Sequence, residues 1–215
     1  GSHRLRRSVI VGAGAASAPP PVLLATGDST MQGIDNFLAD ELGDAATVRS
    51  DVRPGTGVSK SDWQAIVDAQ VKRDHPSVAV VSLGVNEGYD LPVPGAGAVK
   101  CCGEAWIAAY TARVQTMMRR YLRDGRGRVI WMTLALPRSD SRAAITRAVN
   151  TAIVRAGSGM RGVSVPRMDL LFSPDGYVDV IRYRGRDVRV RTADGIHLNV
   201  SGTAIAAKLV ADLLR

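Results

Sequence analysis

The chain contains few cysteines, few aromatic residues and no long apolar run. Only 2 of its 215 residues are cysteines, and 5% are aromatic. No apolar stretch approaches the ~18 residues that a membrane-spanning helix needs, so the sequence predicts no such helix. The hydrophobic fraction of 46% and the charged fraction of 22% are ordinary for a globular protein. The length suits one domain with a sizeable core and is short for two.

The formal net charge is +8, which raises the question of a nucleic-acid partner. The arginines are spread along the chain, with local clusters at residues 4–7, 119–128 and 182–191. No cluster is interleaved with aromatic residues, and no helix-turn-helix, zinc-finger or RNA-recognition pattern is present. We therefore expect no nucleic-acid partner. Acidic glycans, anionic lipid headgroups and a polyanionic cell wall are equally compatible with the charge.

The two cysteines are neighbours, Cys101 and Cys102. Metal-binding pairs are usually separated by at least two residues and no histidine is near, so the cysteines predict no zinc site. The sequence implies no other metal and no organic cofactor. Two explanations stay open: two free thiols in a loop, which we favour, or a vicinal disulfide in an oxidising compartment.

The first 21 residues differ from the rest of the chain. Gly1-Ser2-His3 resembles the scar of a cleaved purification tag, and a basic patch, a short Val9-Ile10-Val11 run and a Gly/Ala/Ser/Pro tract follow. This segment is either a plain linker or the remnant of a signal or membrane anchor, which would tether the protein to a membrane domain upstream. Residues 22–215 are expected to form a single domain.

Apolar strand patterns alternate with helical ones from residue 22 onward. The expected strands are 22–26, 45–49, 78–83, 129–134 and 163–165, and the expected helices are 31–42, 61–74, 104–123, 141–156 and 202–214. Residues 177–183 and 187–191 alternate around Gly185 like a small β-hairpin insertion. This order predicts a flavodoxin-like, doubly wound α/β domain whose five-stranded parallel sheet has the strand order 2-1-3-4-5 and helices on both faces.

Polar motifs follow these strands. Gly27-Asp28-Ser29 comes after the first strand, Gly84-Val85-Asn86 after the third, and Asp194-Gly195-Ile196-His197 just before the last helix. Because the ligand crevice of such a sheet lies beyond the carboxyl ends of its strands, the motifs should meet there. They supply a nucleophilic serine, a histidine base with its orienting aspartate, and an amide donor for an oxyanion. We therefore predict a serine esterase.

Taken singly, each residue has a structural explanation. Ser29 and Asp194 are residue types that cap helices and turns. Asn86 and Gly57 are typical of turns, and His197 can be a packed core histidine. Only the combination, in this order and at these strand ends, favours catalysis.

These blocks resemble the SGNH hydrolase family, also called GDSL esterases. The family has a Gly-Asp-Ser block, a glycine after the second strand, a Gly-x-Asn block and a C-terminal Asp-x-x-His. Here the second block is Gly57, with Gly55 as a competitor, and the resemblance covers about residues 22–215. The last block, Asp-Gly-Ile-His, and the charged stretch 186–191 before it are most similar to a bacterial extracytoplasmic subgroup.

The resemblance implies a role for each block. Ser29 is expected to be the nucleophile, His197 the base and Asp194 the group that orients the imidazole. The oxyanion is expected to lie among the Ser29 amide, the Gly57 amide and the Asn86 side chain.

Other residues near these blocks have weaker assignments. The family often has aspartate after the asparagine, where this chain has Glu87, and we expect Glu87 at the rim as a substrate contact. Arg138 follows the fourth strand and is a second candidate contact for an acidic or sugar substrate. Asp28 is expected to brace its turn, and His75 to lie on the surface.

The expected activity is hydrolysis of short-chain acyl esters, O-acetyl groups in particular, on carbohydrate or cell-envelope substrates through an acyl-serine intermediate. Two alternatives are an O-acyltransferase module acting on cell-surface glycans and a non-catalytic glycan-binding module on a hydrolase fold. The resemblance implies an extracytoplasmic protein, exported or membrane-tethered, while a cytoplasmic location and the oligomeric state stay open.

Overall fold

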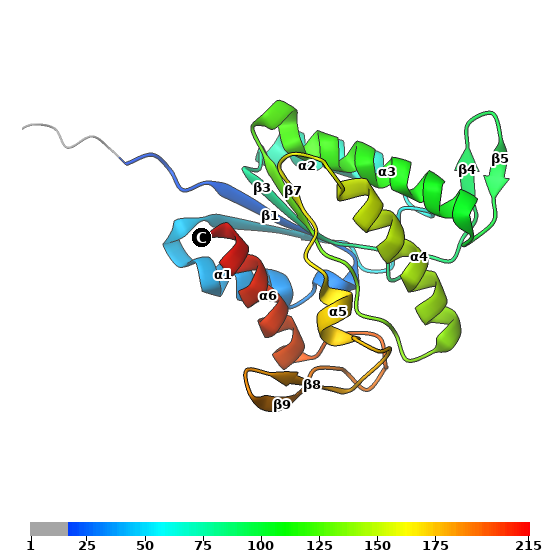
Figure 1. The fold of residues 1–215 in the computed structure, drawn as a ribbon. Coiled ribbons are helices and arrows are strands. Elements are labelled where there is room, and N and C mark those ends of the chain that lie inside the picture. The colour runs from blue at the N-terminus through cyan, green and yellow to red at the C-terminus, as the bar shows by residue number, and fades with distance from the viewer. Residues whose placement is uncertain (1–16) are drawn as a thin grey trace, which may run out of the picture.

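A five-stranded parallel sheet runs through the middle of the molecule, in a computed structural model that describes residues 17–215 (Figure 1). Its strands are β1 (Val22–Gly27), β2 (Thr47–Val52), β3 (Val78–Ser82), β6 (Arg128–Trp131) and β7 (Val163–Ser164). Their order is β2-β1-β3-β6-β7, all neighbours parallel, which confirms the predicted order 2-1-3-4-5. The predictions for Gly1-Ser2-His3 and for the Val9-Ile10-Val11 run lie outside the described residues.

The sheet separates two hydrophobic cores because successive side chains of a strand point to opposite faces. In β1 and β3, Leu24 and Val81 belong to one core, whereas Leu23 and Val80 belong to the other. All four side chains are buried. Strands covered on both faces explain why the apolar runs in the sequence are continuous rather than alternating.

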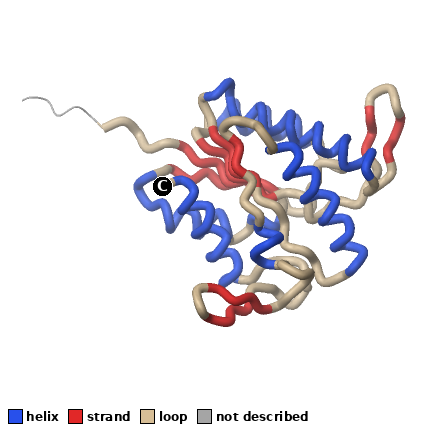
Figure 2. Tube along the Cα trace, viewed as in Figure 1, coloured by secondary structure: helices blue, strands red, loops and turns tan. Residues whose placement is uncertain are grey.

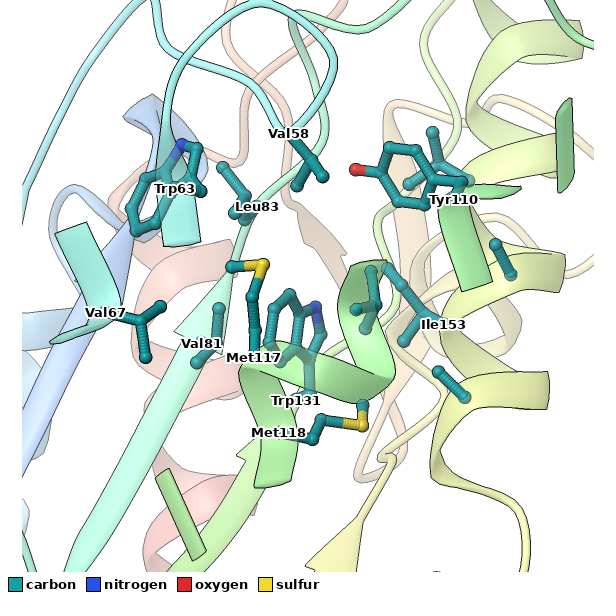
Figure 3. Packing of buried hydrophobic residues seen from close by; sticks show 14 of the residues in the cluster. Val58, Trp63, Val67, Val81, Leu83, Tyr110, Met117, Met118, Trp131 and Ile153 are labelled. Atoms are coloured by element: carbon teal, nitrogen blue, oxygen red, sulfur yellow. The ribbon is translucent and has the colours of Figure 1, made fainter. Parts of the chain in front are cut away.

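Helices cover both faces (Figure 2). The first core is closed by α2 (Trp63–Asp74), α3 (Glu104–Leu122) and α4 (Asp140–Gly157), and the second by α1 (Ile34–Leu42), α5 (Met168–Phe172) and α6 (Val200–Leu214). Figure 3 shows the first core, where Met117 from α3 lies beside Trp131 of β6 and Trp63 from α2 lies near Leu83. Trp63 and Trp106 are fully buried.

Two short hairpins project from this framework. The pair β8 (Val180–Tyr183) and β9 (Arg186–Arg189) is the hairpin that the sequence predicts. The pair β4 (Leu91–Val93) and β5 (Gly97–Val99) lies in a segment expected to be a loop. Its three-residue strands carry a proline and a glycine, so the strand pattern was too short and too interrupted to recognise.

Single helical turns and small boundary shifts account for the other differences. Short 3-10 turns span Ser29–Met31, Gly43–Ala45 and Arg123–Gly125. The second strand starts at Thr47 rather than at residue 45, and α5 was not predicted because it is only five residues long. His75 is exposed at the end of α2, as expected.

Cys101 and Cys102 are joined by a disulfide, which corrects the preference for two free thiols. Both side chains are half-buried and pack against the first core just before α3. No helix in the described part of the chain combines the length and hydropathy needed to cross a bilayer.

Candidate active site

The predicted site residues lie at the carboxyl end of the parallel strands. Ser29 begins the turn that follows β1, Asn86 lies four residues after β3, and His197 comes three residues before α6. An open depression of about 490 Å³ is lined by Ser29, Asp194 and His197. Residues 168 positions apart in the sequence are thus brought to one edge of the sheet.

Ser29, His197 and Asp194 form a continuous hydrogen-bonded chain. The Ser29 Oγ lies 2.7 Å from the His197 Nε2, and the His197 Nδ1 lies 2.6 Å from the Asp194 Oδ2. A carboxylate on Nδ1 favours the tautomer with its proton there, which leaves Nε2 free to accept the serine proton. This arrangement can activate a hydroxyl as a nucleophile.

Asp194 also holds the loop that carries the histidine. Its Oδ1 accepts hydrogen bonds from the Thr192 hydroxyl at 2.5 Å and from the amides of Ile196 and His197 at 2.8 and 3.0 Å. Burial raises the pKa of the Asp194 carboxyl, but the bonds from Thr192, His197 and these two amides outweigh it and hold that pKa well below its usual range. Asp194 is therefore an anion wherever the histidine can act as a base.

The turn before Ser29 depends on Gly27 and Asp28. A Cβ on Gly27 would lie 1.7 Å from the Ser82 carbonyl oxygen, so only glycine allows β1 and β3 to approach so closely. Asp28 is fully buried and accepts from the Thr30 amide and hydroxyl, as expected of a residue that braces the turn. It also accepts from the amides of Gly84 and Val85, at 2.7 and 2.9 Å, and so joins the serine turn to the Asn86 loop.

The expected oxyanion donors lie in loops that contact each other. The Asn86 Nδ2 donates to the Thr56 carbonyl at 2.9 Å, which leaves its second N–H free for a ligand. The Gly57 amide makes a long bond of 3.4 Å to the Ser61 hydroxyl, a weak interaction that a better acceptor can replace. Gly57 is buried and directly follows Thr56, the residue that Asn86 contacts, whereas Gly55 is exposed. Of the two glycines, Gly57 is therefore the better candidate for an oxyanion donor.

Glu87 does not lie at the rim, which corrects the prediction that it contacts substrate. Its side chain is 0% exposed, and its carboxylate accepts hydrogen bonds from Val58, Ser59 and Tyr110. The prediction failed because the preceding residue, Asn86, is half-exposed and the chain turns inward immediately after it.

Arg138 is half-exposed beside the histidine loop. Its guanidinium donates to the Tyr177 hydroxyl at 3.1 Å and to the Ala193 carbonyl at 3.4 Å, and its backbone amide donates to the Gly195 carbonyl at 2.8 Å. Arg138 thus packs against the loop that contains Asp194. A contact with substrate stays a prediction.

Two further arginines support the site and were not identified from the sequence. Arg191 is buried and donates to the Ile196 carbonyl at 3.1 Å, directly before His197. Arg142, at the start of α4, donates to the carbonyls of Val85 and Glu87 on either side of Asn86. No local pattern signals the Arg142 contacts, because Arg142 is more than 50 residues from its partners in the sequence.

Residues 17–215 include no group of three or more histidine, cysteine, aspartate or glutamate side chains placed to hold a metal ion.

The strand order and the helices on both faces of the sheet define a doubly wound α/β protein. The structure aligns with a lipase/acylhydrolase from Enterococcus faecalis at 14% identity, covering 91% of this chain and 95% of that one, with a TM-score of 0.55. It also aligns with an acetyl xylan esterase from Geobacillus stearothermophilus at 15% identity, covering 89% and 93%, with a TM-score of 0.61. Residues 22–213 match a family described as "protein of unknown function (DUF459)", and the chain belongs to that family.

A third similar structure is a carbohydrate esterase family 3 protein from Talaromyces cellulolyticus, at 15% identity, covering 90% and 96%, with a TM-score of 0.58. At these identities the likeness establishes the fold. A search of curated protein sequences finds no match.

Proposed function

We propose that this protein is a serine-dependent ester hydrolase that removes short acyl groups from carbohydrate or cell-envelope substrates. The observation that carries the proposal is the Ser29–His197–Asp194 chain, with distances of 2.7 and 2.6 Å, at the edge of an open depression. If Ser29 only capped a helix and His197 only packed in the core, neither role would require the hydrogen bond between them.

The proposed reaction follows from the geometry. The Ser29 Oγ attacks the ester carbonyl carbon while the His197 Nε2 takes the hydroxyl proton. The negative charge that develops on the carbonyl oxygen is stabilised by the Ser29 amide, the Gly57 amide and the Asn86 side chain. The tetrahedral intermediate expels the alcohol, which receives the proton from His197. A water molecule then attacks the acyl-serine by the same route and releases the carboxylic acid and free Ser29.

The shape of the depression supports a short acyl group on a polar alcohol. Thr30, Gln32, Thr192 and Thr203 contribute to its lining beside the serine and histidine, and it is open to solvent. A long alkyl chain would gain little burial there, since hydrophobic binding scales with the apolar area removed from water. Similar folds in an acetyl xylan esterase and a carbohydrate esterase support the same class of substrate.

The proposal is tested by reacting the folded protein with a fluorophosphonate probe and locating the adduct by peptide mass spectrometry. We expect one adduct, on Ser29, which disappears in Ser29→Ala. Ser164→Ala is the matched control because Ser164 is an exposed serine on β7, and its labelling should equal that of the wild type. A folded protein that does not label would contradict the proposal and favour a non-catalytic glycan-binding module.

Substrate choice is tested with acetyl and octanoyl esters of the same alcohol. We expect the acetyl ester to be cleaved with the higher kcat/KM. Acetylated oligosaccharides incubated with an acceptor glycan then separate hydrolysis from transfer: free acetate without acylated acceptor supports the hydrolase, and acylated acceptor in excess of acetate supports an O-acyltransferase.

A further inference from the structure

Two buried carboxylates lie next to the expected oxyanion donors in the sequence. Asp28 precedes Ser29 and Glu87 follows Asn86, and both side chains are 0% exposed. Asp28 reaches the Asn86 loop, as described above. Within residues 17–215, neither carboxylate forms an ion pair with a basic side chain, so hydrogen bonds alone compensate for their burial.

Glu87 reaches the loop that carries Gly57. One carboxylate oxygen accepts from the Val58 amide at 2.6 Å and from the Tyr110 hydroxyl at 3.0 Å. The other accepts from the Ser59 amide at 3.2 Å and from the Ser59 hydroxyl. Three of these four bonds therefore hold the two residues that directly follow Gly57.

Gly57 itself is shaped by this carboxylate. A Cβ on Gly57 would lie 3.0 Å from the Glu87 Oε1 and 3.2 Å from its carboxyl carbon, so the carboxylate occupies the space that a side chain at position 57 would need. On the other side, Asn86 holds the Thr56 carbonyl. Asn86 and Glu87, which are adjacent in one loop, thus hold the Thr56–Gly57 peptide group and the Gly57–Val58 peptide group, respectively.

We infer that Glu87 is a positioning residue that fixes the Gly57 amide relative to the Asn86 side chain, so that both donors point at the same oxyanion. The inference rests on the proposed function. Oxyanion donors act only when they lie about 2.7–3.1 Å from the oxygen that becomes charged. Loosening the loop therefore weakens binding of the transition state and leaves substrate binding nearly unchanged.

The test is Glu87→Gln, which keeps the size of the side chain. Its NH₂ group must face either the Val58 amide or the Ser59 amide, and two donors cannot bond, so one of the backbone bonds is lost. Since removing a whole oxyanion donor costs ~10²–10³ in kcat, displacing one is expected to lower kcat about tenfold or more. KM should stay within about twofold, because only transition-state binding is weakened. Inhibition by an alkylboronic acid, which becomes a tetrahedral anion on the serine, should weaken by a similar factor.

Tyr110→Phe is the matched control. It removes a hydrogen bond from the same carboxylate but none from residues 57–59, so the melting temperature should fall while kcat and boronic-acid inhibition stay near wild type. Ser59→Ala is the second variant and serves if Glu87→Gln does not fold. It removes the hydroxyl bond to Glu87 and should lower kcat and boronic-acid affinity together by a few-fold, since a single hydrogen bond contributes ~1 kcal/mol.

Two results would overturn the inference. One is a folded Glu87→Gln, or in its absence Ser59→Ala, with wild-type kcat and boronic-acid affinity. The other is an equal loss of kcat in Tyr110→Phe, which would mean that Glu87 only stabilises the fold. The same proteins are labelled with the fluorophosphonate probe: an unlabelled wild type refutes the proposed function, whereas a labelled wild type with an unaffected Glu87→Gln refutes only the role of Glu87.

Discussion

The two sides of the candidate site differ in how they meet solvent. On the proton-transfer side, the side chains of His197 and Asp194 are 31% and 45% exposed. On the oxyanion side, the carboxylates of Asp28 and Glu87 are completely buried. Groups that exchange protons with substrate and water need that access. Groups that only aim N–H donors act best where water is excluded and the hydrogen bonds are stronger.

The same contrast separates rate from stability. Changes on the exposed side remove the groups proposed to transfer protons without leaving buried polar atoms unpaired. Changes on the buried side leave backbone amides without acceptors, which costs ~1–3 kcal/mol for each unsatisfied group. Measuring activity and unfolding in the same variants can therefore separate the contributions of the two sides.

The largest effect on activity is expected from Asp194→Asn, a change on the exposed side. An amide at this position presents the wrong partner to the His197 Nδ1, and loss of the orienting carboxylate in such triads lowers kcat by about 10³–10⁴-fold. The free energy of unfolding at neutral pH should fall only modestly, because the asparagine oxygen can keep the hydrogen bonds of Oδ1 while the charge is lost. Steady-state kinetics and urea unfolding test this, with Asp175→Asn as the control because Asp175 is exposed outside the site. A loss below tenfold would remove Asp194 from the triad.

The next largest effect is expected from Asn86→Ala, on the oxyanion side. Loss of one oxyanion donor should lower kcat by about 10²-fold with little change in stability, since Asn86 is only half-buried. Asn36→Ala, at an exposed position of α1, is the control. An unaffected rate in Asn86→Ala would exclude Asn86 as a donor.

A smaller effect is expected from Arg138→Ala. The Arg138 side chain is 54% exposed, and its ion pair with Asp179 is long, at 4.0 Å. Exposed pairs of this kind contribute ~1 kcal/mol or less, so kcat on a neutral acetyl ester should fall about fivefold or less. A selective rise in KM for acetyl esters of acidic glycans would show that Arg138 contacts substrate, and equal KM changes for both ester types would show that it does not.

The smallest effect, and the one that compares the two sides directly, is in the pH dependence of stability. Burial raises the pKa of the Glu87 carboxyl, although its hydrogen bonds oppose this, whereas the pKa of Asp194 is lowered. The Glu87 contribution is present below its unfolded pKa of about 4.3 and is lost as the pH rises through the folded pKa. The Asp194 contribution is present above about 3.9 and is lost as the pH falls.

Urea unfolding of the wild type, Glu87→Gln and Asp194→Asn between about pH 3 and 8 measures both. The stability advantage of the wild type over Glu87→Gln should shrink as the pH rises, and its advantage over Asp194→Asn should shrink as the pH falls. If both stability differences change in the same direction with pH, the pKa shifts of the two carboxyls do not have opposite signs.

Much of the fold followed from local sequence patterns. Continuous apolar strands between helical segments predict a covered parallel sheet, and that topology brings Ser29, Asn86 and His197 to one edge. The side chains that hold these residues in place did not follow. Glu87, Arg142 and Arg191 make their contacts through the fold, and no spacing in the sequence indicates whether a charged residue in a loop turns inward. The β4–β5 hairpin escaped prediction because its strands are short and carry proline and glycine.

The direction of the sheet decides how the domain can be attached to something else. Pro21 and Val22, at the start of β1, line the same hollow as Leu214 and Arg215 at the end of α6. The start of β1 and the end of α6 therefore lie together at the amino edge of the sheet, and Ser29 lies at the carboxyl edge. A label, a fusion partner or a solid support joined at the end of α6 therefore lies on the side of the sheet away from Ser29, and the depression of an immobilised protein faces the bulk solution.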